Sequence, residues 1–120
     1  MCYIGLGSNV GMRAYNLASA RQALTLQVGP IYNTSAIYET EPWGFQADNW
    51  FYNQIVALET TIPAEQLMRM LLDIEKQLGR DRSQSESYES RVIDLDLLSY
   101  GTLVIHIPDL TLPHPRMHER

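Results

Sequence analysis

Apolar residues recur along this chain with two different periods, which predict two helices and four main strands. Over positions 12–28 and 63–78 they recur every three or four residues, as on the buried face of a helix. Gly29-Pro30 and Gly79 follow these segments as helix terminators. Runs rich in β-branched and aromatic residues predict strands at residues 1–6, 31–39, 51–60 and 92–100, with a short partner strand at 103–107.

The order of these predicted elements indicates the fold class. The order β-α-β-β-α-β is that of a ferredoxin-like sandwich of the α+β class, in which an antiparallel sheet carries both helices on one face. Neither a linker nor an internal repeat interrupts the sequence. Residues 1–120 are therefore predicted to form one domain.

Two aspartates lie inside the last of the four main strands. In an extended strand Asp94 and Asp96 share one face while Leu95 and Leu97 point into the core, which places the two acidic Cα atoms about 6.6 Å apart. Like charges this close repel unless a cation lies between them, and Mg²⁺ prefers carboxylate oxygens that it shares with phosphates. The alternative is a half-solvated strand that happens to carry two acids, and the spacing alone favours that alternative.

The distribution of arginines favours the first interpretation. The net charge of −5 argues against nucleic-acid binding, yet five of the nine basic residues fall at or after residue 80, and only Lys76 is a lysine. A local arginine cluster in an acidic chain is typical of a protein that binds a small anion. A single cysteine, no long apolar stretch and no signal segment predict a cytoplasmic protein that does not enter a membrane.

Three other groups of residues resemble known functional motifs. The glycines at 5, 7 and 11 do not match the dinucleotide fingerprint, and no P-loop lysine motif is present, so arginines and metal would have to hold any nucleotide phosphates. A zinc site at His114 and His118 is disfavoured, because prolines surround His114 and no third ligand lies nearby. Aromatic residues gather at 43 and 50–52, either as ordinary core or as a stacking site for a flat ring whose edge Asn53 would recognise.

Taken together, these residues resemble the 6-hydroxymethyl-7,8-dihydropterin pyrophosphokinase family from residue 3 to residue 120. The resemblance rests on motifs that occur in order along the chain. They are Gly5-Leu6-Gly7-Ser8-Asn9, Tyr38-x-Thr40-x-Pro42-x-Gly44, Phe51-Tyr52-Asn53, Val56-Ala57-Leu58-Glu59-Thr60, Ile74-Glu75-x-x-x-Gly79-Arg80-x-Arg82, Arg91-x-x-Asp94-Leu95-Asp96-Leu97-Leu98 and Leu112-Pro113-His114-Pro115-Arg116-Met117-x-x-Arg120.

The resemblance implies an enzyme that transfers the βγ-diphosphate of ATP to the hydroxymethyl group of the pterin and releases AMP. It implies two Mg²⁺ ions held by Asp94 and Asp96, with ATP as co-substrate, small molecules as the only partners, and a monomer or weak dimer. Asp94 and Asp96, with Arg82 and Arg91, would be catalytic. The implied pterin-binding residues are Thr40, Trp43, Gly44, Phe51, Asn53 and Tyr88, and the implied ATP-binding residues are Glu75, Arg82, Arg91, His114 and Arg120.

The chain departs from the family pattern at several positions. Residues 88–91 read Tyr-Glu-Ser-Arg in place of a proline-containing segment, no arginine lies between 82 and 88, and Phe51 replaces a tyrosine found in some relatives. The sequence stops at Arg120, before an aromatic that covers the pterin in the family, so we expect a form of the enzyme whose pterin pocket is open on one side and whose turnover is weak.

Two other functions compete with this interpretation. A non-catalytic ferredoxin-like module that binds a nucleotide or metabolite would not require two metal-facing carboxylates. A ferredoxin-like RNA-binding domain is disfavoured by the negative charge and by the missing aromatic strand motif.

Overall fold

The structure is a computed structural model, and it describes residues 1–41, 50–79, 92–102, 105–107 and 110–112. These residues form two helices and seven strands. Their order is β1 (Cys2–Ser8), α1 (Arg13–Gln27), β2 (Ile31–Thr34), β3 (Tyr38–Thr40), β4 (Phe51–Leu58), α2 (Ala64–Gln77), β5 (Asp94–Tyr100), β6 (Ile105–Ile107) and β7 (Leu110–Leu112).

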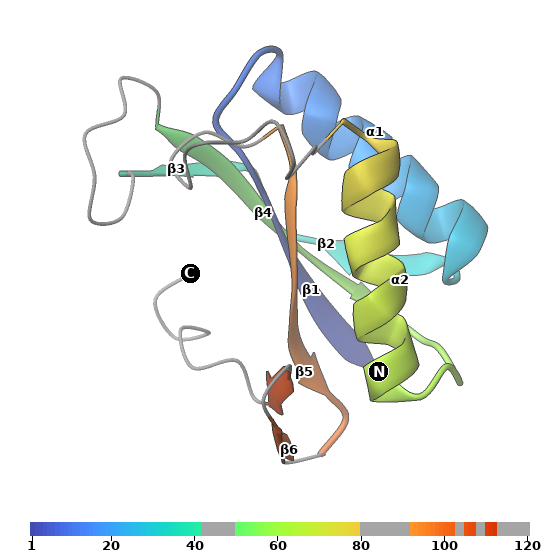
Figure 1. The fold of residues 1–120 in the computed structure, drawn as a ribbon. Helices are drawn as coiled ribbons and strands as arrows, with labels where there is room; N and C mark the ends of the chain where they lie inside the picture. The colour runs from blue at the N-terminus through green and yellow to red at the C-terminus, as the bar shows by residue number, and fades with distance from the viewer. Residues whose placement is uncertain (42–49, 80–91, 103–104, 108–109, 113–120) are drawn as a thin grey trace.

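The main sheet has the topology of the predicted sandwich. Its order is β2-β4-β1-β5, β3 also pairs with β4, and every pairing is antiparallel. Helices α1 and α2 lie side by side on one face of this sheet, and the opposite face carries no helix among the described residues (Figure 1). The predicted α+β, ferredoxin-like fold is therefore confirmed.

The hydrophobic core lies between the sheet and the two helices. Both predicted helical stripes are buried there: Leu17, Ala20 and Leu24 from α1, and Leu67, Leu71 and Ile74 from α2. They pack against Ile4, Leu6, Val56, Leu58, Leu95 and Leu97 from the central strands. No helix in the described part of the chain combines the length and the apolar character that crossing a lipid bilayer requires.

The ends of α2 follow from local chemistry. Pro63 is the N-cap of α2, with a non-helical ψ of 146°. A proline ring would also fit the first position of a helix, but here the helix begins one residue later, at Ala64. Glu65 lies in the first turn and Lys76 in the last, where each charge complements the helix dipole. Gly79 follows with a φ of +107°, a conformation that strains any residue with a side chain.

Several predicted strands have different limits or partners in the structure. The run at 31–39 forms two strands, because Ser35 interrupts the ladder: its hydroxyl accepts the N–H of Ile55 at 2.9 Å, and its own N–H donates to the Ile55 carbonyl at 2.8 Å. The predicted partner of β5 at 103–107 was wrong in its pairing, since Ile105–Ile107 pairs with Leu110–Leu112 to form a separate two-stranded sheet. In addition, β5 begins at Asp94 and not at Val92.

We expect the thiol of Cys2 to be unreactive in the folded protein. Cys2 is 1% exposed, and burial raises its pKa from the usual 9.0 to about 11, which lowers its thiolate fraction at pH 8 about 100-fold. Thiol titration with a chromogenic disulfide should therefore be slow in buffer and fast in 8 M urea. Equal rates in the two solvents would contradict this burial, and no other cysteine in the sequence can confuse the assay.

Candidate active site

The helix-free face of the sheet places predicted site residues of β4 and β5 on either side of β1. On β1, Gly7 pairs with Asn53 of β4 on one side and with Asp94 of β5 on the other, so these three residues form one row across the sheet. In the next row of this face, Gly5 pairs with Asp96. The antiparallel register thus brings together residues about 40 to 90 positions apart in sequence.

The two glycines leave a strip of bare backbone between these side chains. A methyl group on Gly7 would lie 3.4 Å from Asn53 Oδ1, 3.5 Å from Phe51 Cδ1 and 4.0 Å from Asp94 Cβ. Side chains on either side of β1 therefore converge above Gly7, and β1 itself places no side chain between them. This arrangement leaves the face open to a ligand that contacts β4 and β5 at once.

Strand β5 has the alternation that the sequence predicted. Asp94 and Asp96 are partly exposed on the helix-free face, whereas Leu95 and Leu97 are 1% and 2% exposed in the core. The described residues contain no group of three or more His, Cys, Asp or Glu side chains that could hold a metal. Two carboxylates on one open face suit Mg²⁺, which takes its remaining ligands from water and substrate phosphates, better than a closed zinc site.

Glu75 reaches this strand from the opposite face. It lies on α2, is 2% exposed, and its Oε2 accepts the backbone N–H of Leu95 at 2.7 Å. Leu95 stands between the two aspartates, so this charge-assisted hydrogen bond fixes the part of β5 that carries them. The sequence assigned Glu75 to ATP binding; that role stays a prediction, and the contact described here is structural.

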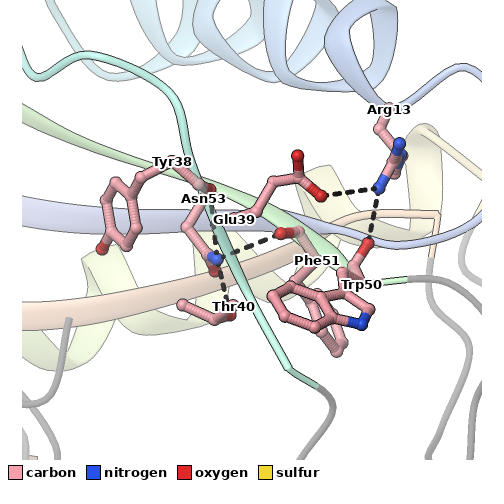
Figure 2. A network of polar contacts seen from close by, with 7 residues as sticks. All are labelled: Arg13, Tyr38, Glu39, Thr40, Trp50, Phe51 and Asn53. Carbon is pink, nitrogen blue, oxygen red and sulfur yellow. Dashed lines mark hydrogen bonds and ion pairs between the residues drawn. The ribbon is translucent and has the colours of Figure 1, made fainter.

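On the other side of Gly7, a polar contact joins β3 to β4. The Nδ2 of Asn53 donates to Thr40 Oγ1 at 2.7 Å, with longer contacts of 3.5 Å and 3.4 Å to the carbonyls of Tyr38 and Phe51 (Figure 2). Thr40 lies directly opposite Phe51 in the β3–β4 pairing. Asn53 is 8% exposed, so its carboxamide is held in a set orientation next to the bare backbone of Gly7.

Several predicted site residues lie outside the described residues. They are Trp43, Gly44, Arg82, Tyr88, Arg91, His114 and Arg120. Of the described ones, the fold brings together Thr40, Phe51, Asn53, Asp94 and Asp96 on one face, while Glu75 lies behind them.

The sequence analysis gave no separate role to Gly7 or to Arg13. In the structure Arg13 contacts Glu39, Trp50 and Tyr52. Glycines at positions 5 and 7, two apart like the aspartates, were the available signal for Gly7. Arg13 had none, because its hydrogen-bond partner Trp50 lies 37 positions away.

Comparison with known proteins identifies the family. The profile of the 7,8-dihydro-6-hydroxymethylpterin-pyrophosphokinase family matches residues 3–120. The chain belongs to this pyrophosphokinase family. The resemblance inferred from the sequence motifs is therefore confirmed, and so is the prediction of an enzyme of folate biosynthesis that uses ATP as co-substrate.

Named relatives agree with the pyrophosphokinase assignment. The chain is similar to the 2-amino-4-hydroxy-6-hydroxymethyldihydropteridine pyrophosphokinase of Porphyromonas gingivalis, with 38% identity over 98% of this chain and 82% of the relative. It is 40% identical to the protein of the same name from Methylorubrum extorquens, over 98% of this chain and 74% of the relative. It also matches the folic acid synthesis protein of Pneumocystis carinii, with 37% identity over 98% of this chain and 16% of that protein. The comparisons do not support a non-catalytic binding module.

Substitution of Glu75 should separate its structural role from nucleotide binding. Glu75→Ala leaves the buried Leu95 N–H without this partner, which should lower the free energy of unfolding by about 1–3 kcal/mol, whereas Glu75→Gln keeps an acceptor and should lower it less. Urea unfolding measures both. If Glu75 acts through Leu95, Glu75→Gln should also keep its KM for ATP within about threefold of the parent value. A large rise in that KM would instead support direct contact with ATP.

Proposed function

We propose that the helix-free face of the sheet is the active site where this pyrophosphokinase transfers the βγ-diphosphate of ATP to the hydroxymethyl oxygen of 6-hydroxymethyl-7,8-dihydropterin, with release of AMP. The observation that carries the proposal is the row formed by Asn53, Gly7 and Asp94. It places a candidate ring-recognition group and a candidate metal ligand on the same face, one strand apart on either side of a glycine.

Asp94 and Asp96 are the proposed Mg²⁺ ligands, and the sequence-based expectation is two ions. Bound Mg²⁺ would neutralise phosphate charge and align the transferred group. The two carboxylates supply oxygen ligands from one strand face, and their backbone is held from behind by Glu75. The protein's own contribution is therefore to position the ions rigidly, which is the larger part of catalysis in phosphoryl transfer.

The pterin is proposed to bind over Phe51 and Asn53. Phe51 offers an aromatic ring for stacking, and the carboxamide of Asn53 offers both a donor and an acceptor to the ring edge. Neighbouring strands lie about 4.8 Å apart, so the Cα atoms of Asn53 and Asp94, on either side of Gly7, are about 10 Å apart. A bicyclic ring recognised at Asn53 can therefore direct its hydroxymethyl arm toward the metal-binding carboxylates.

The phosphate ligands stay predictions from the sequence. ATP would be bound by Arg82, Arg91, His114 and Arg120. Of these, Arg82 and Arg91 would also stabilise the charge that develops on the transferred group. Tyr88 would contact the pterin, and Trp43 and Gly44 would do so from the segment before β4. The substrates are small molecules, while the monomeric or weakly dimeric state and the cytoplasmic location are proposals.

Asp96→Ala should abolish most turnover without unfolding the protein. The lost group is a partly exposed carboxylate on the open face and not part of the core, so kcat should fall by about 10²–10³-fold or more while the melting temperature stays close to that of the parent. A coupled assay of AMP release, with and without the hydroxymethylpterin, measures this. Asp73→Ala, which removes an exposed acid from α2, is the matched control. Near-normal Mg²⁺-dependent turnover of Asp96→Ala would rule out the assignment.

Gly7→Ala should damage the site and spare the fold. The new methyl group would make contacts of ordinary van der Waals length, and alanine is favoured over glycine in a strand by roughly 0.5–1 kcal/mol, so stability should be equal or higher. The same methyl group occupies the space between Phe51, Asn53 and Asp94, and should lower kcat/KM by about tenfold or more. Steady-state kinetics and thermal melting decide this. An unchanged kcat/KM for both substrates would place the ligands elsewhere.

A further inference from the structure

Arg13, the first residue of α1, makes three contacts behind the proposed pterin site. Its guanidinium lies 3.8 Å from the centroid of the Tyr52 ring, and Nη1 donates to the backbone carbonyl of Trp50 at 2.8 Å. The same Nη1 is 3.8 Å from Glu39 Oε2 (Figure 2). One side chain therefore contacts the middle residue of β3, the residue just before β4, and β4 itself.

These contacts lie on the helix side of the strands that present the pterin residues. In the β3–β4 pairing, Glu39 is opposite Tyr52 and Thr40 is opposite Phe51. Because side chains alternate along a strand, Glu39 and Tyr52 face α1 while Thr40 and Phe51 face the open side. Arg13 thus contacts, from the helix side, residues that are adjacent in sequence to Thr40 and Phe51.

Strand β3 needs such support. It is three residues long and pairs with β4 in the described sheet, so few ladder hydrogen bonds hold it. Arg13 contacts both Glu39 of β3 and Trp50, the residue before β4. The charge-assisted bond to the Trp50 carbonyl and the cation–π contact carry most of the attraction, because the ion pair with the half-exposed Glu39 is long and screened.

We propose that Arg13 is a positioning residue that sets the distance between β3 and the start of β4, and thereby holds Thr40, Phe51 and Asn53 in the arrangement that binds the pterin. The inference rests on the proposed function, because it takes these three residues as the pterin site. Arg13 touches neither substrate in this scheme. Its loss should therefore affect pterin recognition and leave ATP recognition nearly intact.

Arg21 provides a matched control on the same helix. Its Nη1 donates to Gln54 Oε1 at 2.7 Å, and Gln54 in turn donates to the Ser35 carbonyl at 2.8 Å, so Arg21 supports the junction of β2 and β3 and not the start of β4. The guanidinium groups of both arginines contact side chains of β4: that of Arg13 lies over the Tyr52 ring, and that of Arg21 donates to Gln54. Methionine at either position keeps an aliphatic side chain and removes the charge. A purely structural effect should be similar in the two variants.

Kinetics of the full chain tests the proposal. Arg13→Met should raise the KM for the hydroxymethylpterin by about tenfold or more, while the KM for ATP and kcat change by less than about threefold. Arg13→Lys keeps a cation over Tyr52 and should recover part of the loss. Arg21→Met should leave the pterin KM within about threefold. Equal pterin KM values for Arg13→Met and Arg21→Met would overturn the proposal.

Tryptophan fluorescence gives a readout without substrate. Trp43 and Trp50 are the two tryptophans of the sequence, so in a Trp43→Phe background the emission reports on Trp50 alone. Arg13→Met should increase acrylamide quenching of Trp50 at least about twofold, because the local bond that holds its backbone is gone, and Arg21→Met should not. Unchanged quenching in Arg13→Met would show that Arg13 does not hold this segment and would overturn the proposal.

Asn53→Ala separates this proposal from the proposed function. If Asn53→Ala raises the pterin KM strongly and Arg13→Met does not, the site assignment stands and the positioning role of Arg13 is wrong. If neither variant changes the pterin KM although Trp50 quenching increases in Arg13→Met, the pterin binds elsewhere, and the proposed function of this face fails together with the inference drawn from it.

Discussion

The antiparallel pairing of β1 between β4 and β5 is the constraint on which the described site depends. Its register places Gly7 between Asn53 and Asp94 and places Gly5 beside Asp96. A shift of one residue in either pairing would turn the carboxylates or the carboxamide toward the helices and would bury these polar groups in the core. The register is held by that core, since Ile4 and Leu6 of β1 are fully buried on the helix side. Packing on one face of the sheet therefore decides the chemistry of the other.

Two charged side chains extend this coupling. Glu75 of α2 binds the backbone of β5 between the two aspartates, and Arg13 of α1 binds the backbone before β4 and lies over the Tyr52 ring. Each helix thus contributes one ionic group that fixes the backbone of a strand whose functional side chains point the other way. Rigid support of this kind suits phosphoryl transfer, in which the protein mainly positions the reactants and neutralises charge. The glycines of β1 complete the arrangement because they keep the space between the two halves of the site free.

Much of this could be predicted from local sequence patterns. The stripe at Leu67, Leu71 and Ile74 predicted α2, and the alternation of Asp94 and Asp96 with Leu95 and Leu97 predicted which side of β5 is buried. Interactions between distant segments could not be predicted in this way. The break between β2 and β3 arises because the hydroxyl of Ser35 accepts the N–H of Ile55. The pairing of β6 with β7 likewise depends on which strands the folded chain brings next to each other. Glu75 was assigned to a nucleotide by its motif, whereas its described contact is with a strand.

The sequence by itself determined the residue types and their periods, and with them the family, the helices, the order of helices and strands along the chain, and the acidic pair. These features follow from interactions between residues close in sequence, or from motifs that can be recognised in the sequence itself. Only the tertiary structure decided that Asn53, Gly7 and Asp94 form one row across the sheet, and that Arg13 donates a hydrogen bond to the backbone carbonyl of Trp50, next to Phe51. The physical reason is that strand register and contacts between helix and sheet result from burying the whole core at once, which no local pattern encodes.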